Sequence, residues 1–273
     1  MKALLVVDRR FYAADGHWLT EGATGPETGE RYLRWFSSVE VAGREGEATG
    51  FVPASLNKVS APQLNVTFLP NLSGITTRIG NLSRARAQLG RLIDDADCVI
   101  ARLPGELPLE AAKLALAKGK PLAIDLGGCA LDGLRHHGSL KGRIYAPISY
   151  RNLKSVVRRC QWVSYVTQEF LQSRYPAAPG ATTVACSNVS IPTPEQQILD
   201  KRLKRIELAE RPLTFGTIGS LHGRFKGVQD AIAALGAVKA QLPPFRYKVL
   251  GGGDPAPWRK LAARHELADE VIF

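Results

Sequence analysis

Short apolar runs alternate with longer amphipathic stretches along most of this chain. The first run, residues 2–7 (KALLVV), precedes a polar, glycine-rich loop. Apolar runs of this length predict buried strands, whereas apolar residues spaced three and four apart predict helices. Further strands are predicted at 39–42, 65–69, 97–102, 121–125, 162–167 and 182–186. Helices are predicted between them at 30–36, 84–96, 106–118, 150–159 and 168–173.

The pattern restarts after a charged segment at residues 192–211. Strands are then predicted at 213–219, 245–250 and 271–273, with helices at 227–241 and 257–267. Strands that alternate with helices of 10–15 residues indicate parallel sheets with right-handed crossovers. The fold class is therefore α/β with two Rossmann-like domains. We expect the first at 1–191, a linker at 192–211 and a partial second domain at 212–273.

Composition narrows the class of protein. The 273 residues exceed the usual size of one domain, and 45% apolar with 22% charged residues excludes a disordered, collagenous or coiled-coil chain. The net charge is +11, and residues 1–100 are neutral in sum, with 11 basic and 11 acidic side chains. The excess of basic over acidic side chains therefore lies after residue 100, and it indicates either an anionic partner or a solvated basic surface. No zinc-finger, helix-turn-helix or RNP-like motif accompanies it, so nucleic acid is not expected.

Four cysteines, Cys98, Cys129, Cys160 and Cys186, lie about 30 residues apart and form no CxxC pair. This spacing favours neither a zinc site nor a redox motif, and indicates a reduced, cytoplasmic compartment. There is no signal-like amino terminus and no run of 18 apolar residues. Aromatic and basic side chains at 150–159 suit peripheral contact with the inner face of an anionic membrane. A solvated helix face explains the same pattern.

The most informative stretch is 216–227 (GTIGSLHGRFKG). A predicted strand ends at Gly219, a short loop carries Arg224 and Lys226, and a helix follows. Glycine lets the backbone approach a ligand, and the N–H groups at a helix start favour an anion. A guanidinium fork with an ammonium group suits a pyrophosphate. The spacing matches neither the G-x-G-x-x-G nor the P-loop pattern, so a solvent-facing basic loop remains the alternative.

A second glycine-rich loop at 251–254 (GGGD) also joins a strand to a helix. Close approach of the backbone at Gly252 to a ligand is one interpretation. A flexible turn in which Asp254 caps the next helix is the other.

Three polar residues follow or end the strand at 121–125. Asp125, Asp132 and His137 lie where open α/β sheets place ligands, so they are weak catalytic candidates as proton or hydroxyl partners, with structural roles as the alternative. The pair His136-His137 has no third ligand at metal spacing. Asp95 and Asp97 lie at a predicted helix-to-strand turn, away from the carboxyl ends of the strands. We therefore expect no metal and no other cofactor.

At this point the residues resemble a known family. Stretches in the second half look like the donor domain of retaining, family-4-type glycosyltransferases of the GT-B fold: TIGS (217–220), RFKG (224–227), LGGGD (250–254) and VIF (271–273). The first half is similar to a subgroup linked to capsular and exopolysaccharide synthesis: RLP (102–104), GKP (119–121), HGSLKG (137–142), YVTQEFLQSRYP (165–176) and CSNV (186–189).

By this resemblance the first domain binds a glycan or lipid-linked acceptor and the second binds a nucleotide-sugar. Arg224 and Lys226 match the basic pair that holds the donor diphosphate, with Gly219 and Gly252 in the same binding loops. The resemblance implies a hexosyl-type transfer with retention and without a metal. It also implies that the family's donor domain continues past its third strand into an acidic, glycine-containing motif. We therefore expect a chain truncated in its donor domain, with weak or no turnover.

Two other function classes stay open. One is a non-catalytic protein that binds anions or lipids through the first domain and its basic surface. The other is a sugar-nucleotide epimerase of related two-domain architecture, which should carry more acidic and histidine side chains than this sequence shows.

Overall fold

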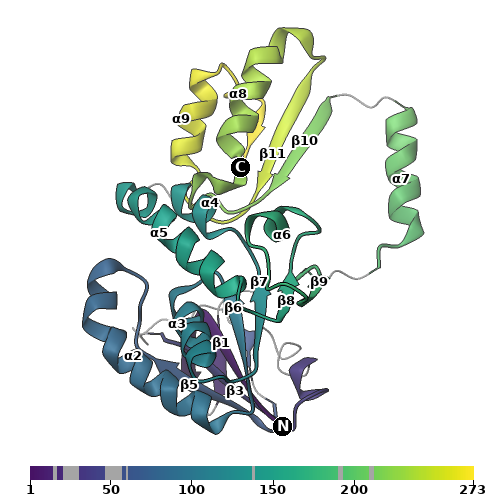
Figure 1. The fold of residues 1–273 in the computed structure, drawn as a ribbon. Coiled ribbons are helices and arrows are strands. Elements are labelled where there is room, and N and C mark those ends of the chain that lie inside the picture. The colour runs from purple at the N-terminus through teal and green to yellow at the C-terminus, as the bar shows by residue number, and fades with distance from the viewer. Residues whose placement is uncertain are drawn as a thin grey trace. The chain divides into compact units, whose positions relative to one another are not determined.

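The computed structural model describes residues 1–14, 17–20, 31–46, 57–59, 61–136, 139–189, 193–208 and 212–273. The chain divides into two compact units (Figure 1). Unit 1 comprises Met1–Ala130 and Ile148–Val189, and unit 2 comprises Leu131–Pro147 and Ser190–Phe273. The predicted boundaries at 191 and 211 stay a prediction.

Unit 1 is built on a parallel sheet. Its strands are β1 (Lys2–Ala14), β3 (Ser38–Glu45), β5 (Leu64–Leu69), β6 (Cys98–Leu103), β7 (Leu122–Leu126), β8 (Trp162–Tyr165) and β9 (Thr182–Ala185). They pair in the order β5-β3-β1-β6-β7-β8-β9. In this order the strands run outward from β1 in both directions, as in a Rossmann fold. The predicted α/β class and parallel sheet are confirmed.

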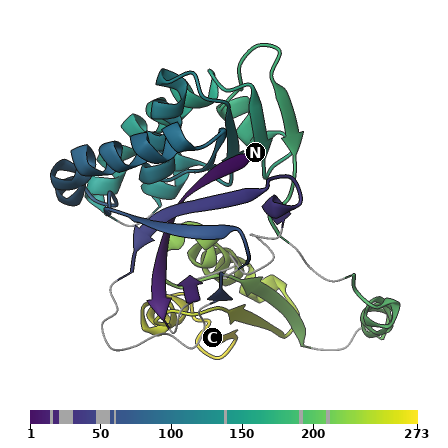
Figure 2. The ribbon, with the colours of Figure 1, turned by 90° about the horizontal axis from the view of Figure 1, so that it is seen from below.

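Helices cover one face of this sheet: α2 (Ile75–Asp95), α3 (Glu106–Ala117) and the part of α5 (Leu140–Val157) that belongs to unit 1, from Ile148 onward. Leu89, Leu107 and Leu153 from these helices pack against inward residues of β6, β7 and β8. The opposite face over β1, β3 and β5 holds a smaller core around Phe11 and Val41. Figure 2 shows β1 and β3 from below, with the helices of unit 1 on one side of these strands.

Several elements are longer than the apolar pattern predicts. Strand β1 continues through charged residues to Ala14, because its end pairs with the antiparallel β2 (His17–Thr20), which in turn pairs with β4 (Asn57–Lys58). Helix α2 begins at Ile75 instead of residue 84, and α5 at Leu140 instead of residue 150. These extra turns carry few buried side chains, so no apolar periodicity marks them.

Two further helices are short. Helix α6 (Phe170–Arg174) connects β8 to β9. Helix α4 (Ala130–Arg135) follows β7 and begins where unit 1 meets the unit 2 segment of the chain.

Unit 2 has a three-stranded parallel sheet in the order β10 (Leu213–Ile218), β11 (Phe245–Leu250), β12 (Val271–Ile272). Helices α8 (Val228–Val238) and α9 (Ala256–Arg264) cover one face, where Ile232, Tyr247 and Trp258 form the core. Two 3₁₀ turns, η1 (Arg224–Lys226) and η2 (Lys239–Gln241), flank α8. In the segment predicted as a linker, α7 (Gln196–Glu207) has no buried residue.

Candidate functional site

Two loops of unit 2 lie side by side at the carboxyl ends of their strands. The loop after β10 and the loop after β11 are joined by two backbone hydrogen bonds, from Gly219 N to Leu250 O and from Leu221 N to Gly252 O, each 2.8 Å. The buried indole of Trp258 donates to Leu221 O at 3.1 Å and anchors the same loop to α9. Ligands of open α/β sheets bind at this edge.

The glycines of these loops have different roles. A Cβ atom on Gly251 would clash with the carbonyl of Gly219, and Gly253 has a φ of +123° with Leu221 against it. Gly251 and Gly253 are therefore required by the packing of the protein itself. A Cβ atom on Gly252, in contrast, would meet nothing within 4 Å. Among these three glycines, Gly252 is the one whose open side faces free space.

Asp254 takes the capping alternative. Asp254 lies one position before Pro255, the N-cap residue of α9. Its Oδ1 accepts a hydrogen bond of 2.9 Å from Ala256 N at the start of this helix. The carboxylate thus satisfies a backbone donor in the first helical turn.

The two predicted cations lie in the turn η1, directly before α8. Arg224 and Lys226 are both exposed, and the stem of Lys226 packs so closely on Gly219 that a Cβ atom there would lie 2.8 Å from Lys226 Cγ. Gly227 follows with a φ of +72° and starts the helix. Two cations, a helix amino terminus and close-packed glycines therefore meet on one pair of loops. The predicted residues Gly219, Arg224, Lys226 and Gly252 are brought together.

The predicted catalytic candidates do not form one cluster in the described residues. Asp125 lies on β7 in unit 1, where Arg102 Nε donates to its Oδ2 at 2.9 Å. Asp132 lies on α4 in the part of the chain that belongs to unit 2. His137 lies outside the described residues. All three stay weak candidates.

Asp95 and Asp97 occupy the helix-to-strand turn that the sequence predicts. Lys2 Nζ pairs with Asp95, and the backbone N–H of Lys2 donates to Asp97 Oδ2 at 2.7 Å. The hydrogen bond from Lys2 holds the pKa of Asp95 below its usual value and raises the pKa of Lys2. Within the described part of the chain, no group of three His, Cys, Asp or Glu side chains has an arrangement that could hold a metal ion.

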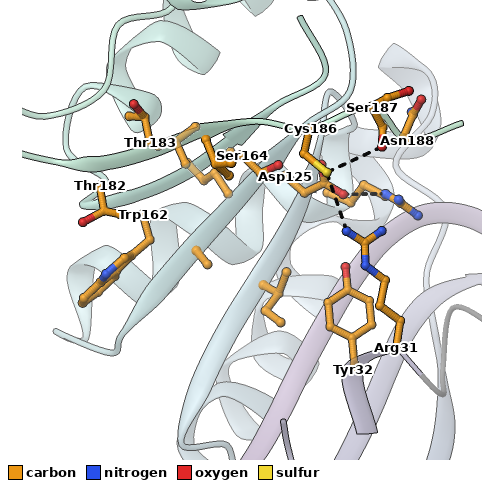
Figure 3. Close-up of a pocket in the computed structure, with 16 residues that line it drawn as sticks. Arg31, Tyr32, Asp125, Trp162, Ser164, Thr182, Thr183, Cys186, Ser187 and Asn188 are labelled. Atoms are coloured by element: carbon orange, nitrogen blue, oxygen red, sulfur yellow. Dashed lines mark hydrogen bonds and ion pairs between the residues drawn. The ribbon is translucent and has the colours of Figure 1, made fainter. Parts of the chain in front are cut away.

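A pocket of about 370 Å³ opens on the face of the unit 1 sheet opposite the helices (Figure 3). The strand register places Arg102, Asp125 and Ser164 in one row across β6, β7 and β8. Ala123 and Trp162 form the neighbouring row. The sequence predicts a role for Asp125 but not the pocket. These pocket residues occupy every second position of β6, β7 and β8, and no single one of them forms a motif that would reveal a binding site.

Charge is concentrated at one end of this pocket. Arg31 reaches Cys186, with Nη2 4.0 Å from Sγ, beside the Arg102–Asp125 ion pair. Burial, and then the charge of Arg102, lower the pKa of Arg9. Burial is also the main cause that raises the pKa of Tyr32 in the pocket wall, followed by the charge of Asp125. Two guanidinium groups of the pocket wall, those of Arg31 and Arg102, therefore share the neighbourhood of one carboxylate.

Comparisons with known proteins identify the type of fold. No family model matches the chain. Protein CapJ of Staphylococcus aureus is 25% identical over 219 residues, which are 80% of this chain and 54% of that protein. The chain thus spans about half the length of this curated relative. Sucrose-phosphate synthase from Thermosynechococcus elongatus superposes with a TM-score of 0.55 at 13% identity, covering 100% of this chain and 69% of that one. The chain has a GT-B-type fold. The GT-B resemblance inferred from the sequence motifs is therefore confirmed at the level of the fold.

No helix in the part of the chain that the structure describes is long and apolar enough to cross a membrane.

Proposed function

We propose that the protein is a glycosyltransferase that takes a sugar from a nucleotide-sugar, and that the loops of unit 2 hold the donor diphosphate. The observation that carries this proposal is the meeting of Arg224 and Lys226 with the start of α8 on loops locked together by glycine. Such a site offers positive charge and backbone N–H groups on a rigid support.

This arrangement can assist the departure of the nucleoside diphosphate. As the bond between the sugar and the diphosphate breaks, negative charge grows on the leaving oxygen. Preplaced cations and a helix amino terminus stabilise that charge more in the transition state than in the substrate, which accelerates the step. The two cations supply this stabilisation without a metal ion. Transfer of a hexosyl unit with retention is the finer form of the proposal, and it rests on the sequence resemblance.

Unit 1 takes the acceptor in this proposal. Its pocket between Arg102 and Trp162 combines polar groups with an exposed aromatic ring, a lining that suits a glycan or the glycan part of a lipid-linked acceptor. Asp125 is the pocket's carboxylate, and its pairing with Arg102 keeps it available as a hydrogen-bond acceptor for a sugar hydroxyl.

We place the enzyme in the cytoplasm with peripheral contact on an anionic membrane. All four cysteines are unpaired thiols. Helix α5 carries basic side chains and no acidic one, and Arg151 within it is exposed. Leu140, Ile144 and Ile148 recur at every fourth position of the same helix and are at least half exposed. Apolar and basic groups on one helix suit an anionic lipid surface.

Sedimentation with vesicles tests the membrane contact. Vesicles of phosphatidylcholine with 30% phosphatidylglycerol should retain the protein at low salt and release it at high salt. Ile148→Ser with Arg151→Gln should weaken binding. Equal binding to pure phosphatidylcholine would contradict the proposal.

The transfer reaction is tested with a panel of nucleotide-sugars and glycan or lipid-linked acceptors. Detection of a new glycosidic product by mass spectrometry, its loss in Arg224→Ala with Lys226→Ala, and an unchanged anomeric configuration by NMR would support the proposal. Nucleoside-diphosphate binding that is unchanged in the double variant would favour the alternative, a non-catalytic anion- or lipid-binding protein.

A further inference from the structure

The pocket of unit 1 has two chemically distinct ends. Figure 3 shows Trp162 at one end, with Arg31 and Tyr32 at the other and Asp125 between them. Trp162 lies two strands across and two residues along from Arg102, so their Cα atoms are roughly 12 Å apart by ordinary strand geometry. A ligand that touches both ends must be elongated and of disaccharide size.

The aromatic end offers a flat apolar surface. Trp162 is 52% exposed although it belongs to the sheet, and its neighbour in the register, Ala123, is too small to cover it. Hydroxyl groups of Ser164 and Thr182 stand beside it. An indole face with hydroxyl groups at its rim suits a pyranose ring, whose faces are apolar and whose edge is polar.

The charged end carries more positive than negative charge. Among the described lining residues, Arg31 and Arg102 contribute +2 and Asp125 contributes −1, so these three groups sum to +1. An anionic group between Arg31 and Arg102 would balance this charge, and guanidinium forks match carboxylate and phosphate oxygens in pairs.

We propose that this pocket binds an acceptor sugar that carries an anionic group, a carboxylate or a phosphate, with the anion at Arg31 and Arg102 and a ring on Trp162. The inference rests on the proposed function, because it names the acceptor class of the same enzyme. It adds Arg31, Arg102 and Trp162 as the residues that select this acceptor.

The test measures binding of four probes by calorimetry: digalacturonate, galactose 6-phosphate, neutral galactobiose and uridine monophosphate. At least one anionic sugar should bind about tenfold or more tightly than galactobiose, since a charge-assisted hydrogen bond contributes that much. Tighter binding of digalacturonate would indicate that the pocket selects a carboxylate, and tighter binding of galactose 6-phosphate would indicate that it selects a phosphate. Arg31→Gln should remove the preference, and Trp162→Ala should weaken binding of the anionic and the neutral sugar alike.

Arg158→Gln is the matched control, because it removes the same charge from an exposed position on the helical side of unit 1 and should change nothing. Equal affinity for anionic and neutral sugars, an equal loss in Arg158→Gln, or tighter binding of uridine monophosphate at Trp162 would overturn the inference. Its failure is separable from that of the proposed function. Nucleoside-diphosphate binding at Arg224 and Lys226 with no anionic-sugar binding overturns only this inference, and the reverse pattern overturns the transferase proposal and leaves an anionic-sugar site without an acceptor role.

Discussion

The carbonyl oxygen of Gly219 occupies the space that a Cβ atom on Gly251 would need. This contact, together with the hydrogen bond from Gly219 N to Leu250 O, holds the two candidate diphosphate loops against each other. One added methyl group at residue 251 would push the loops apart. At residue 252 the same methyl group would meet open space.

Gly251→Ala should therefore lower the free energy of unfolding by about 1–3 kcal/mol, as expected for overpacking. Gly252→Ala should stay within about 0.5 kcal/mol of the parent protein. Denaturant titration of both variants measures the difference. If a diphosphate approaches the backbone at Gly252, that variant should lose nucleoside-diphosphate affinity at full stability. Equal stability of the two variants would contradict the loop geometry.

Gly227 starts α8 with a φ of +72°, a left-handed conformation. Gly227→Ala should lower the free energy of unfolding by about 1 kcal/mol, and Gly227→Asn by less, because asparagine tolerates this conformation better. Gly133→Ala on α4, where a Cβ atom meets nothing, should be neutral or stabilising. Thermal unfolding of the three variants provides the measurement. An unaffected Gly227→Ala would show that the residue does not adopt this conformation.

Glu110 is fully buried on α3 and pairs with Arg78, Arg86 and Lys113. Replacement by Gln would remove the carboxylate that pairs with Arg86 and Lys113, would leave Arg78 with Glu106 alone, and should lower the free energy of unfolding by about 1–3 kcal/mol. Asp94→Asn, which breaks the exposed pair with Lys118, is the control and should cost well under 1 kcal/mol. Similar effects of the two substitutions would contradict a central role for the buried group.

The effect of Glu110 should depend on pH. Burial raises the pKa of Glu110, but hydrogen bonds and charge from Lys113 and Arg86 lower it to a net value below the usual one. A depressed pKa in the folded state gives stability that is complete above the unfolded pKa, about 4.3, and is lost as the pH falls through the folded value. The stability difference between parent and Glu110→Gln should therefore be constant near neutral pH and shrink below about pH 4. A difference that grows on acidification would contradict this assignment.

The thiols should react in order of exposure. Cys160 is 1% exposed and donates to Leu122 O and Trp162 O, and burial raises its pKa. Cys186 is partly exposed in the wall of the unit 1 pocket. Iodoacetamide at pH 8, followed by peptide mass spectrometry, should modify Cys186 first and Cys160 only on unfolding. Equal rates in the folded protein would show that β8 is not packed as described.

The apolar pattern was sufficient to predict most of the strands. Residues 245–250 and 162–165 are strands because β-branched and aromatic side chains alternate or cluster there, and the observed β11 and β8 agree. Helix starts were predicted less well. Residues 77–80 near the start of α2 and 140–144 at the start of α5 are mostly exposed, so the stability of these turns comes from continuation of the helix, which leaves no mark in the hydrophobic pattern.

The candidate site divides in the same way. The glycines and cations of 219–227 are local in sequence, so their meeting on one loop could be predicted from spacing. The contact of Gly219 with Gly251 depends on the register of β10 and β11, and the pocket depends on rows formed across β6, β7 and β8. Such long-range rows are set by strand pairing, which the sequence alone did not specify.

The central claim is that Arg224 and Lys226 hold the diphosphate of a nucleotide-sugar. Calorimetry with uridine, guanosine and adenosine diphosphates tests it most directly, using the double variant Arg224→Ala with Lys226→Ala. Arg202→Ala with Lys204→Ala, which removes the same charge from exposed positions of α7, is the control. We expect at least one nucleotide to bind the parent and the control equally and the double variant about 100-fold more weakly, because two charge-assisted contacts are lost. Equal weakening in both double variants, or no binding of any nucleoside diphosphate, would contradict the account.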